Sequence, residues 1–375
     1  MEDISLQSRI DLLTEQQVLI QDSAIAFIAA DEELKTVRAN RFVQPGFDRQ
    51  VWREMVDLGW LGFLVPEQYG GMGLGFSDLH TVLIQLGKGL SPAPYTATAV
   101  IAAGVLAKAD NEALKANRLT ALLAGDWIPA LAWQEVRGSM DVRAEQVKVS
   151  DGKLSGKKMF VPDAGGADAF IVSAASAAGT ELYLIDKDAA GLSVDYEQRV
   201  DGGFYGHLTF DQVAAGEQVA SAQAAEQVLA AALDEGRLAA SAELLGVMTR
   251  ALEISMDYIS QRVQFDKPIG SFQALQHKSV DLYVLSEISR SVVLQTVALF
   301  DSSASAKERA IGASQVKARC SDAALQITKD AIQLHGGIGY TDEANIGLYL
   351  KKAMYLSSWL GNATAHRARY ADLTL

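Results

Sequence analysis

The stretch that decides the fold is residues 147–196, VKVSDGKLSGKKMFVPDAGGADAFIVSAASAAGTELYLIDKDAAGLSVDY. Short runs of alternating apolar and polar residues are separated there by the pairs DG, SG, GG and AG. This pattern is typical of antiparallel strands joined by tight turns, because such turns favour residues that tolerate a positive φ. The sequence therefore predicts an antiparallel β domain over residues 129–218.

Helical periodicity flanks this segment on both sides. Before it, residues 10–34 (IDLLTEQQVLIQDSAIAFIAADEEL) and 47–66 (FDRQVWREMVDLGWLGFLVP) carry apolar residues at helical spacing. A glycine-rich loop, EQYGGMGLGFSDLH (67–80), returns to helix at Ser77, the predicted N-cap. After the β segment, helical periodicity resumes near Glu217 and continues to the end. The predicted fold is α+β, with a helical domain over 1–128, the β domain, and a helical domain over 219–375.

Composition excludes several classes of protein. The chain has 375 residues, of which 49% are hydrophobic, as in a globular protein of two or three domains. No run of eighteen or more apolar residues occurs, and the N-terminal MEDISLQSRIDLLTEQQ (1–17) lacks the basic start and apolar core of a signal peptide. No membrane insertion and no metal site are predicted. The net charge of −13 argues against nucleic acid as a partner. The single cysteine, Cys320, excludes an internal disulfide and favours a reducing compartment, for which we predict the cytoplasm.

Three glycines interrupt the helical texture at residues 333–341, QLHGGIGYT. Each glycine costs a helix about 0.5–1 kcal/mol relative to alanine, so a purely helical role does not explain them. Gly336 and Gly337 would let backbone N–H groups approach a phosphate closely. Arg262 would supply a guanidinium and Gln273 an amide to the same anionic ligand. The alternative is a simple helix–helix turn together with a solvated arginine at a helix end.

Four motifs in sequence order resemble the acyl-CoA dehydrogenase family: residues 58–75 (LGWLGFLVPEQYGGMGLG), 155–174 (SGKKMFVPDAGGADAFIVSA), 261–278 (QRVQFDKPIGSFQALQHK) and 333–341. The resemblance covers nearly the whole chain. It implies an N-terminal helical domain, a central β-barrel and a C-terminal four-helix bundle. It also implies FAD bound between barrel and bundle, with a neighbouring subunit completing the site.

The resemblance also implies which residues contact FAD. They are Arg262, Phe265, Gln273, Gln333, Gly336 and Gly337 on the pyrophosphate side, and Trp133, Gln134, Phe160, Asn362 and Thr364 near the flavin ring. The match is weaker at the ring. Gln134 stands where the family usually has a hydroxyl residue, and Pro162 has neither a hydroxyl nor an N–H. Asp266 replaces a customary glycine beside Arg262.

The family's reaction is α,β-dehydrogenation of an acyl-CoA thioester, in which a carboxylate removes the α-proton while the β-hydrogen leaves as hydride to the flavin. The family keeps this glutamate at one of two positions. The first corresponds to Leu360, before Gly361 in YLSSWLGNAT (355–364), and the second to Gly236, before Arg237 in LDEGRLAASAELLG (233–246). Neither position holds a carboxylate, so the catalytic base is left unassigned.

Glu235 and Glu243 are the remaining candidates for the base. Glu235 neighbours Gly236, but one residue along a helix rotates the side chain by about 100°. Glu243 shares the helix face of Gly236 but lies about 10 Å further along the axis. Both are alternatively structural or solvated. Arg237 is predicted to contact the substrate, with a structural helix arginine as the alternative.

Three further stretches, LSPAPYTATAV (90–100), AELLG (242–246) and WLGNATAHR (359–367), resemble bacterial members that act on steroid side chains and similar bulky thioesters. That subgroup implies an α2β2 assembly with a homologous subunit, in which only one kind of chain carries the glutamate. A homodimer or homotetramer is the alternative, and an electron-transfer flavoprotein is the implied electron acceptor. Three interpretations stay open: an FAD-dependent acyl-CoA dehydrogenase subunit, a catalytically silent structural partner, and another flavoenzyme such as an oxidase or monooxygenase.

Overall fold

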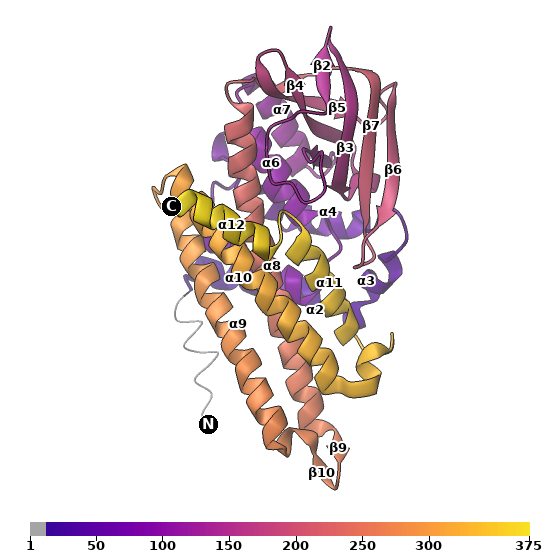
Figure 1. Cartoon of the computed structure of the whole chain (residues 1–375), viewed down its shortest axis with the longest axis vertical. Coiled ribbons are helices and arrows are strands. Elements are labelled where there is room, and N and C mark those ends of the chain that lie inside the picture. The colour runs from indigo at the N-terminus through magenta and orange to yellow at the C-terminus, as the bar shows by residue number, and fades with distance from the viewer. Residues whose placement is uncertain (1–12) are drawn as a thin grey trace.

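The computed structural model describes residues 13–375, which form an N-terminal group of helices, a central sheet and a bundle of long helices (Figure 1). The predicted helix over 10–34 corresponds to α2, and its first three residues lie outside the described residues, as does most of the predicted non-signal N-terminus. The N-terminal helices are α2 (Glu15–Ala29), α3 (Lys35–Asn40), α4 (Arg49–Asp57), α5 (Phe76–Lys88), the π-helical segment Thr96–Ala102, α6 (Ala103–Lys108) and α7 (Glu112–Leu123).

The start of α5 is capped from a distant part of the chain. Gly75 is its N-cap residue, and the Asp301 carboxylate accepts hydrogen bonds from the N–H groups of Phe76 and Ser77, both at 2.7 Å. The prediction of Ser77 as the N-cap is therefore wrong. A carboxylate satisfies the free N–H groups of the first turn as well as a local cap does, and no local pattern reveals it.

The central sheet has eight strands in the order β6-β7-β3-β2-β4-β5-β8, with β1 pairing in parallel to β4. Most neighbours are antiparallel, as the turn pattern predicted. The sheet has its own core, which includes Leu154, Phe170 and Leu208. Its strands are β1 (Pro129–Ala132), β2 (Lys148–Ser150), β3 (Lys153–Pro162), β4 (Ala169–Ser176), β5 (Gly179–Asp186), β6 (Leu192–Gln198), β7 (Phe204–Ala214) and β8 (Gln218–Ala220).

Long helices make up the C-terminal part, and a two-stranded hairpin lies at its end remote from the sheet (Figure 1). The predicted α+β fold class, with helical ends and a central β part, is confirmed. The elements are α8 (Ala225–Gln261), β9 (Val263–Gln264), β10 (Lys267–Pro268), α9 (Gln273–Phe300), α10 (Ala306–His335), α11 (Ile346–Ser358) and α12 (Ala363–Thr374).

Two glycines allow α5 and α8 to cross at close range. A Cβ added at Gly246 would lie 1.9 Å from the carbonyl oxygen of Ile84, and one added at Gly87 would lie 2.1 Å from the carbonyl oxygen of Glu243. Such distances are shorter than any van der Waals contact, so both positions require glycine. This crossing fixes the part of α8 that carries Glu243 against the N-terminal helices.

One face of α9 is apolar and exposed. Val280, Tyr283, Val284 and Ile288 have exposed fractions of 59, 50, 47 and 47%. Among the described residues α9 is also the one helix long and apolar enough to cross a membrane, and a third of its most apolar stretch is buried. A single helix of this kind is weak evidence for a membrane span. A contiguous apolar patch on a helix equally marks a surface that another chain covers.

Candidate active site

A cavity of about 280 Å³, which we call the ring cavity, lies between the sheet and the turn that connects α11 to α12. It gathers four of the residues predicted to lie near the flavin ring, namely Trp133, Gln134, Phe160 and Asn362. Thr364 is exposed on α12 and is not part of its lining. The other lining residues are Arg137, Gly138, Ser139, Glu197, Tyr205, Ser358, Trp359, Leu360, Gly361 and Ala365.

Phe160 reaches the ring cavity because β3 is irregular at this point. The register between β3 and β7 shifts between Lys158 and Val161, and Phe160 itself has a φ of 55°. A bulge of this kind re-aims one side chain without ending the strand. The Phe160 ring packs edge-on against Tyr205, with ring centroids 5.6 Å apart, and the Arg137 guanidinium lies 5.0 Å from its centroid.

The two unusual residues on the ring side provide no free hydrogen-bond donor. Gln134 Nε2 donates to the carbonyl oxygens of Val136 and Ser139, both at 3.2 Å. Both N–H groups of this amide are thus used within the loop that follows Gln134. Pro162 pairs with Tyr205 in the strand ladder and has no N–H. The ring cavity thus keeps aromatic walls, while the side chains at these two positions offer no free hydrogen-bond donor to a bound ring.

A buried ion pair supports the wall of the ring cavity behind Trp133. Lys158 Nζ lies 2.6 Å from Glu135 Oε1, and it also donates to the carbonyl oxygen of Trp133 at 3.2 Å. Burial lowers the pKa of Lys158 to about 8, although Glu135 acts to raise it. For Glu135, burial acts to raise the pKa, but Lys158 and backbone N–H donors outweigh it and hold the pKa below its ordinary value. The pair is therefore charged at neutral pH and ties β3 to the end of β1.

The two positions at which the family keeps its glutamate lie next to each other in space. Leu360, in the turn between α11 and α12, has a φ of 62°, a left-handed backbone conformation. A Cβ added at Gly236 would lie 3.1 Å from Leu360 Cδ1 and 2.5 Å from Ile101 Cδ1. Apolar side chains therefore fill the space that a glutamate at position 236 or 360 would occupy.

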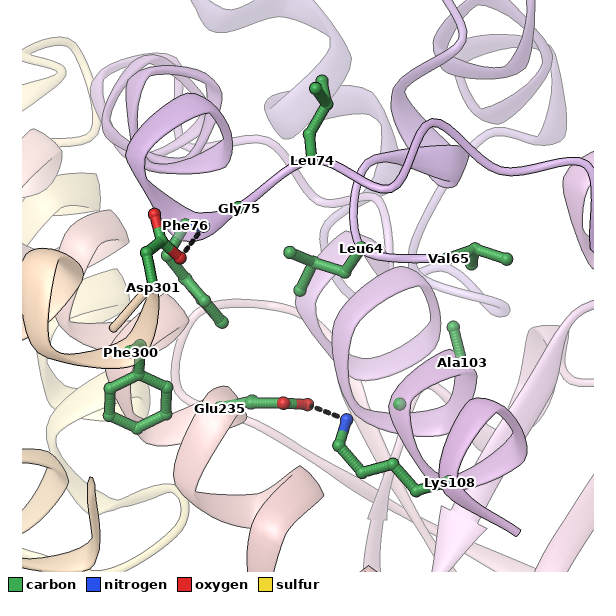
Figure 2. A pocket seen from close by; sticks show the side chains of 11 residues that line it. Leu64, Val65, Leu74, Gly75, Phe76, Ala103, Lys108, Glu235, Phe300 and Asp301 are labelled. Atoms are coloured by element: carbon green, nitrogen blue, oxygen red, sulfur yellow. Dashed lines mark hydrogen bonds and ion pairs between the residues drawn. The ribbon is translucent and has the colours of Figure 1, made fainter. Parts of the chain in front are cut away.

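Glu235 lies at a different cavity, of about 190 Å³. Its Oε2 lies 2.8 Å from Lys108 Nζ, and Figure 2 shows these two side chains facing each other, with Phe300 and Asp301 on another wall. Among the described residues this cavity shares no lining residue with the ring cavity. Because Glu235 is paired with a lysine and points elsewhere, its placement opposes the role of base.

Glu243 is buried where the N-terminal helices, the sheet and the bundle meet. Its Oε1 accepts a hydrogen bond from Thr96 Oγ1 at 2.5 Å, and its Oε2 lies 3.8 Å from Lys352 Nζ. Burial raises the pKa of Glu243, although Lys352 and Thr96 act to lower it. Glu243 lines a small cavity together with Trp359, which also lines the ring cavity. It therefore lies behind Trp359 and is engaged with residues of its own chain.

Arg237 is almost completely buried, with an exposed fraction of 1%. Its Nη1 donates to Asp234 Oδ1 at 2.7 Å and its Nε to the carbonyl oxygen of Leu360 at 3.2 Å. Both partners belong to the interior of the chain. This placement opposes the predicted contact with substrate and gives Arg237 a structural role at the Leu360 turn.

Six of the predicted cofactor-binding residues lie together at the remote end of the bundle, and we call them the distal set. They are Arg262, Phe265, Gln273, Gln333, Gly336 and Gly337, and none of them lines the ring cavity. The β9–β10 hairpin turns at Phe265 and Asp266, whose φ values are 53° and 62°, as a two-residue type I′ turn requires. Asp266 thus adopts the conformation for which the family customarily uses glycine. The Phe265 side chain at this tip is 84% exposed.

Gly336 ends α10 with a φ of 64° and a ψ of −140°, a conformation essentially restricted to glycine. A Cβ added at Gly336 or Gly337 would meet nothing within 4 Å, so this backbone faces open space. His335, in contrast, stacks on Tyr258 with ring centroids 4.4 Å apart, and its Nδ1 lies 2.8 Å from the Ala331 carbonyl oxygen. The glycines thus leave a surface that a phosphate group can approach, and His335 is a packing residue.

Several residues of the site did not emerge from the sequence, namely Ile101, Arg137, Lys158 and Tyr205. Lys158 had a usable signal, because a lysine at an inward position of an alternating strand needs a buried partner. Ile101 had no such signal in the sequence, because it contacts Gly236 from a helical segment that lies far from α8 along the chain. Within residues 13–375, no group of three or more His, Cys, Asp or Glu side chains could hold a metal ion.

Comparison with known sequences gives a consistent picture. Residues 14–126 match the profile of the acyl-CoA dehydrogenase N-terminal domain, and residues 226–373 match that of the acyl-CoA dehydrogenase C-terminal domain. Acyl-CoA dehydrogenase FadE27 of Mycobacterium tuberculosis is 29% identical over 331 residues, which cover 86% of this chain and 87% of the relative.

Solved structures agree with these matches. The G363A variant of the Tcur3481–Tcur3483 steroid acyl-CoA dehydrogenase (ACAD) is 31% identical, with a TM-score of 0.86 over 96% of this chain and 97% of that chain. The ChsE4–ChsE5 complex from Mycobacterium tuberculosis is 26% identical, with a TM-score of 0.87 over 96% of this chain and 97% of that chain. The profile matches, the near-complete coverage and the site geometry together show that the chain belongs to the acyl-CoA dehydrogenase family of oxidoreductases.

Proposed function

We propose that this chain is a subunit of an FAD-dependent acyl-CoA dehydrogenase, that it has no proton acceptor at either position where the family keeps its glutamate, and that it works with a homologous subunit that carries one. The observation behind this proposal is that Leu360 and Ile101 fill the space beside Gly236. Dehydrogenation needs a base within hydrogen-bond reach of the substrate α-carbon. FAD, the cofactor of the family, supplies the hydride acceptor when bound, but a leucine and a glycine cannot accept the proton.

The position of the distal set supports a shared cofactor site. Arg262 follows Gly236 by 26 residues along α8, which corresponds to about 39 Å at the helical rise. We infer that one FAD does not contact both places on the same chain. The distal set fits an anionic cofactor, because its arginine and amides are exposed and its glycine backbone faces open space. The ring cavity fits less well, since Gln134 and Pro162 offer no donor. This chain is therefore better equipped to complete a partner's FAD site than its own.

The exposed face of α9 is the proposed contact for that partner. Val280, Tyr283, Val284 and Ile288 lie at helical spacing on one side, and all are about half exposed or more. A patch of this kind on a bundle whose remote end carries the exposed Phe265 hairpin fits a hydrophobic interface with a second, similarly folded subunit. The ChsE4–ChsE5 relative is a complex of two differently named chains, which supports an α2β2 arrangement over a homo-oligomer.

The remaining parts of the proposal follow from the relatives and the composition. We propose a bulky acyl-CoA, such as a steroid side-chain thioester, as the substrate of the assembly, because a solved relative is a steroid ACAD. An electron-transfer flavoprotein is the proposed electron acceptor. The cytoplasm is the proposed location, supported by a single cysteine that is buried and free.

The first test compares the chain alone with the co-expressed pair. Purified alone, the chain is expected to be colourless and unable to reduce a dye acceptor with an acyl-CoA, because Gln134 and Pro162 provide no free side-chain donor on the ring side and neither family position holds the base. Co-purified with a homologue that carries the glutamate, it is expected to yield a yellow complex with flavin absorbance near 450 nm. Dye reduction by the chain alone would contradict the proposal.

The second test concerns Arg262. In the co-purified complex, Arg262→Ala is expected to weaken FAD binding roughly 10- to 100-fold, because a charge-assisted hydrogen bond contributes about 1.5–3 kcal/mol. Fluorescence titration of the deflavinated complex with FAD measures the effect. Arg143→Ala is the matched control, since Arg143 is exposed on the sheet side and is paired with Asp141. Equal FAD affinity in all three proteins would mean that the distal set does not contact the cofactor.

A further inference from the structure

Lys317 of α10 is fully buried, with an exposed fraction of 0%. No carboxylate among residues 13–375 forms an ion pair with it. Its Nζ instead donates to the main-chain carbonyl oxygens of Ser357 and Gly361, at 3.2 and 3.0 Å, and lies 3.3 Å from Ser321 Oγ. A buried lysine that bonds to main-chain carbonyls holds a loop in place, because its desolvation is offset only by those hydrogen bonds.

Two further side chains bond to the same turn. Arg237 Nε donates to the carbonyl oxygen of Leu360 at 3.2 Å, and His366 Nε2 lies 3.0 Å from the same oxygen. A carbonyl only accepts, so this contact places the imidazole hydrogen on Nε2. Burial lowers the pKa of His366 to about 2, so the imidazole is neutral in the folded chain. Three helices thus donate to the 357–361 backbone: α8 through Arg237, α12 through His366, and α10 through Lys317 and, at 3.5 Å, the Ser321 hydroxyl.

The turn needs this support because its backbone is strained. Leu360 and Gly361 have φ values of 62° and 105°, and the left-handed conformation costs a residue other than glycine about 1–2 kcal/mol. The Ser357 carbonyl belongs to the last turn of α11, where carbonyls lack helical partners. Without hydrogen-bond donors from other helices, the carbonyl oxygens of the turn would have no partners and the strained backbone conformation would not be maintained.

The surroundings of Lys317 are electropositive. Burial lowers its pKa to about 7, with the nearby Arg237 acting in the same direction and Cys320 acting against it. The other charged groups packed around the turn are Arg369 and Asp234, which bond to each other. Both the amine and the ammonium carry enough N–H groups to donate to two carbonyls. The hydrogen bonds of Lys317 to the turn are therefore compatible with either protonation state.

We propose that Lys317 is a positioning residue, which fixes the 357–362 turn so that Trp359 lines the ring cavity and the side chain at position 360 points at Gly236. The turn contains position 360, where the family can place its catalytic glutamate and where this chain has leucine. The geometry of the turn therefore decides whether a side chain at position 360 can reach a substrate. Lys317 itself lines neither the ring cavity nor the small cavity beside Glu243. It acts through the main chain.

Hydrogen–deuterium exchange on the purified full chain tests the proposal. In Lys317→Met, amides in the 357–363 segment are expected to exchange at least 10-fold faster than in wild type, with the rest of the bundle unchanged. Lys115→Met is the matched control, since Lys115 is also buried but lies on α7, where it pairs with Glu112, and makes no bond to the turn. It is expected to leave the 357–363 segment unchanged.

The outcomes separate positioning from simple packing. Unchanged exchange at 357–363 in Lys317→Met overturns the proposal, and so does faster exchange spread evenly over the bundle. If the methionine variant does not fold, Lys317→Gln takes its place, because its shorter amide keeps an N–H donor and is expected to raise exchange at the turn to a smaller extent. The exchange measurement does not depend on the proposed function, so failure of one leaves the other to its own test.

Discussion

Replacing Leu360 by glutamate is expected to give this chain the ability to exchange the α-proton of an acyl-CoA with solvent, measured as deuterium incorporation into the thioester by mass spectrometry. The backbone at position 360 is already left-handed and aims the side chain at Gly236. A carboxylate there would occupy the place that the family reserves for its base. A positioned general base contributes about 10²–10⁴-fold, so the variant is expected to exceed wild type by roughly this factor.

Leu360→Gln is the matched control for this experiment. It has nearly the same shape as the glutamate variant but cannot act as a base at neutral pH, so it is expected to stay at the wild-type level. Gly236→Glu is expected to be a poorer way to install the base, because a Cβ at that position would lie 2.5 Å from Ile101 Cδ1 and force the packing apart.

Rapid exchange in the wild-type chain would contradict the absence of a base. Glu197, which lines the ring cavity, and Glu243, which shares the wall residue Trp359 with it, would then be the carboxylates to examine. Loss of that exchange in Glu243→Gln would assign the proton transfer to it. Slow exchange in wild type combined with slow exchange in Leu360→Glu would instead show that acyl-CoA does not reach this cavity.

Lys158→Met is expected to lower the free energy of unfolding by about 3–5 kcal/mol, because removal of one partner from a buried ion pair leaves the other charge uncompensated. Glu135 would keep its backbone donors at Glu145, Gln146 and Val147 but lose its counter-ion at 2.6 Å. Urea unfolding followed by circular dichroism measures the change, with an unchanged slope showing that the unfolded state is the same.

Lys153→Met provides the matched control on the same strand. Lys153 lies at the start of β3 and is exposed, so its replacement is expected to change stability by less than about 0.5 kcal/mol. Equal effects in the two variants would mean that the Glu135–Lys158 pair contributes no more than a surface lysine. A large effect confined to Lys158→Met would show that this pair stabilises the wall of the ring cavity.

Local signals accounted for the fold class. Alternation and turn pairs marked the sheet, and helical spacing marked the long helices, because both depend on side chains close in sequence. The N-cap of α5 was misassigned for the opposite reason. Its N–H groups are satisfied by Asp301, which lies far along the chain, and Ser77 only looked like the nearest cap.

At the site, the sequence revealed which residues were unusual but not what they do. Gln134 and Pro162 stood out against the family pattern, yet only the structure shows that the Gln134 amide bonds to its own loop. Phe160 was expected near the flavin ring, but the bulge that aims it there comes from the register of β3 on β7. Glu243 and Glu235 looked alike as candidates, and their partners, Lys352 and Lys108, set them in different cavities.

The sequence by itself determined the family, the order of helical and β parts, and the absence of a glutamate at Leu360 and Gly236, because each of these depends on residue identity and local spacing. Only the tertiary structure decided that Leu360 and Gly236, neither of which is a glutamate, lie side by side, and that Ile101 and Leu360 fill the space beside Gly236. It also decided that Lys317 bonds to the turn. The contacts of Gly236 with Ile101 and Leu360 join segments more than a hundred residues apart, and those of Lys317 with the turn span 40 and 44 residues. Packing in three dimensions sets them, and no periodicity in the sequence encodes them.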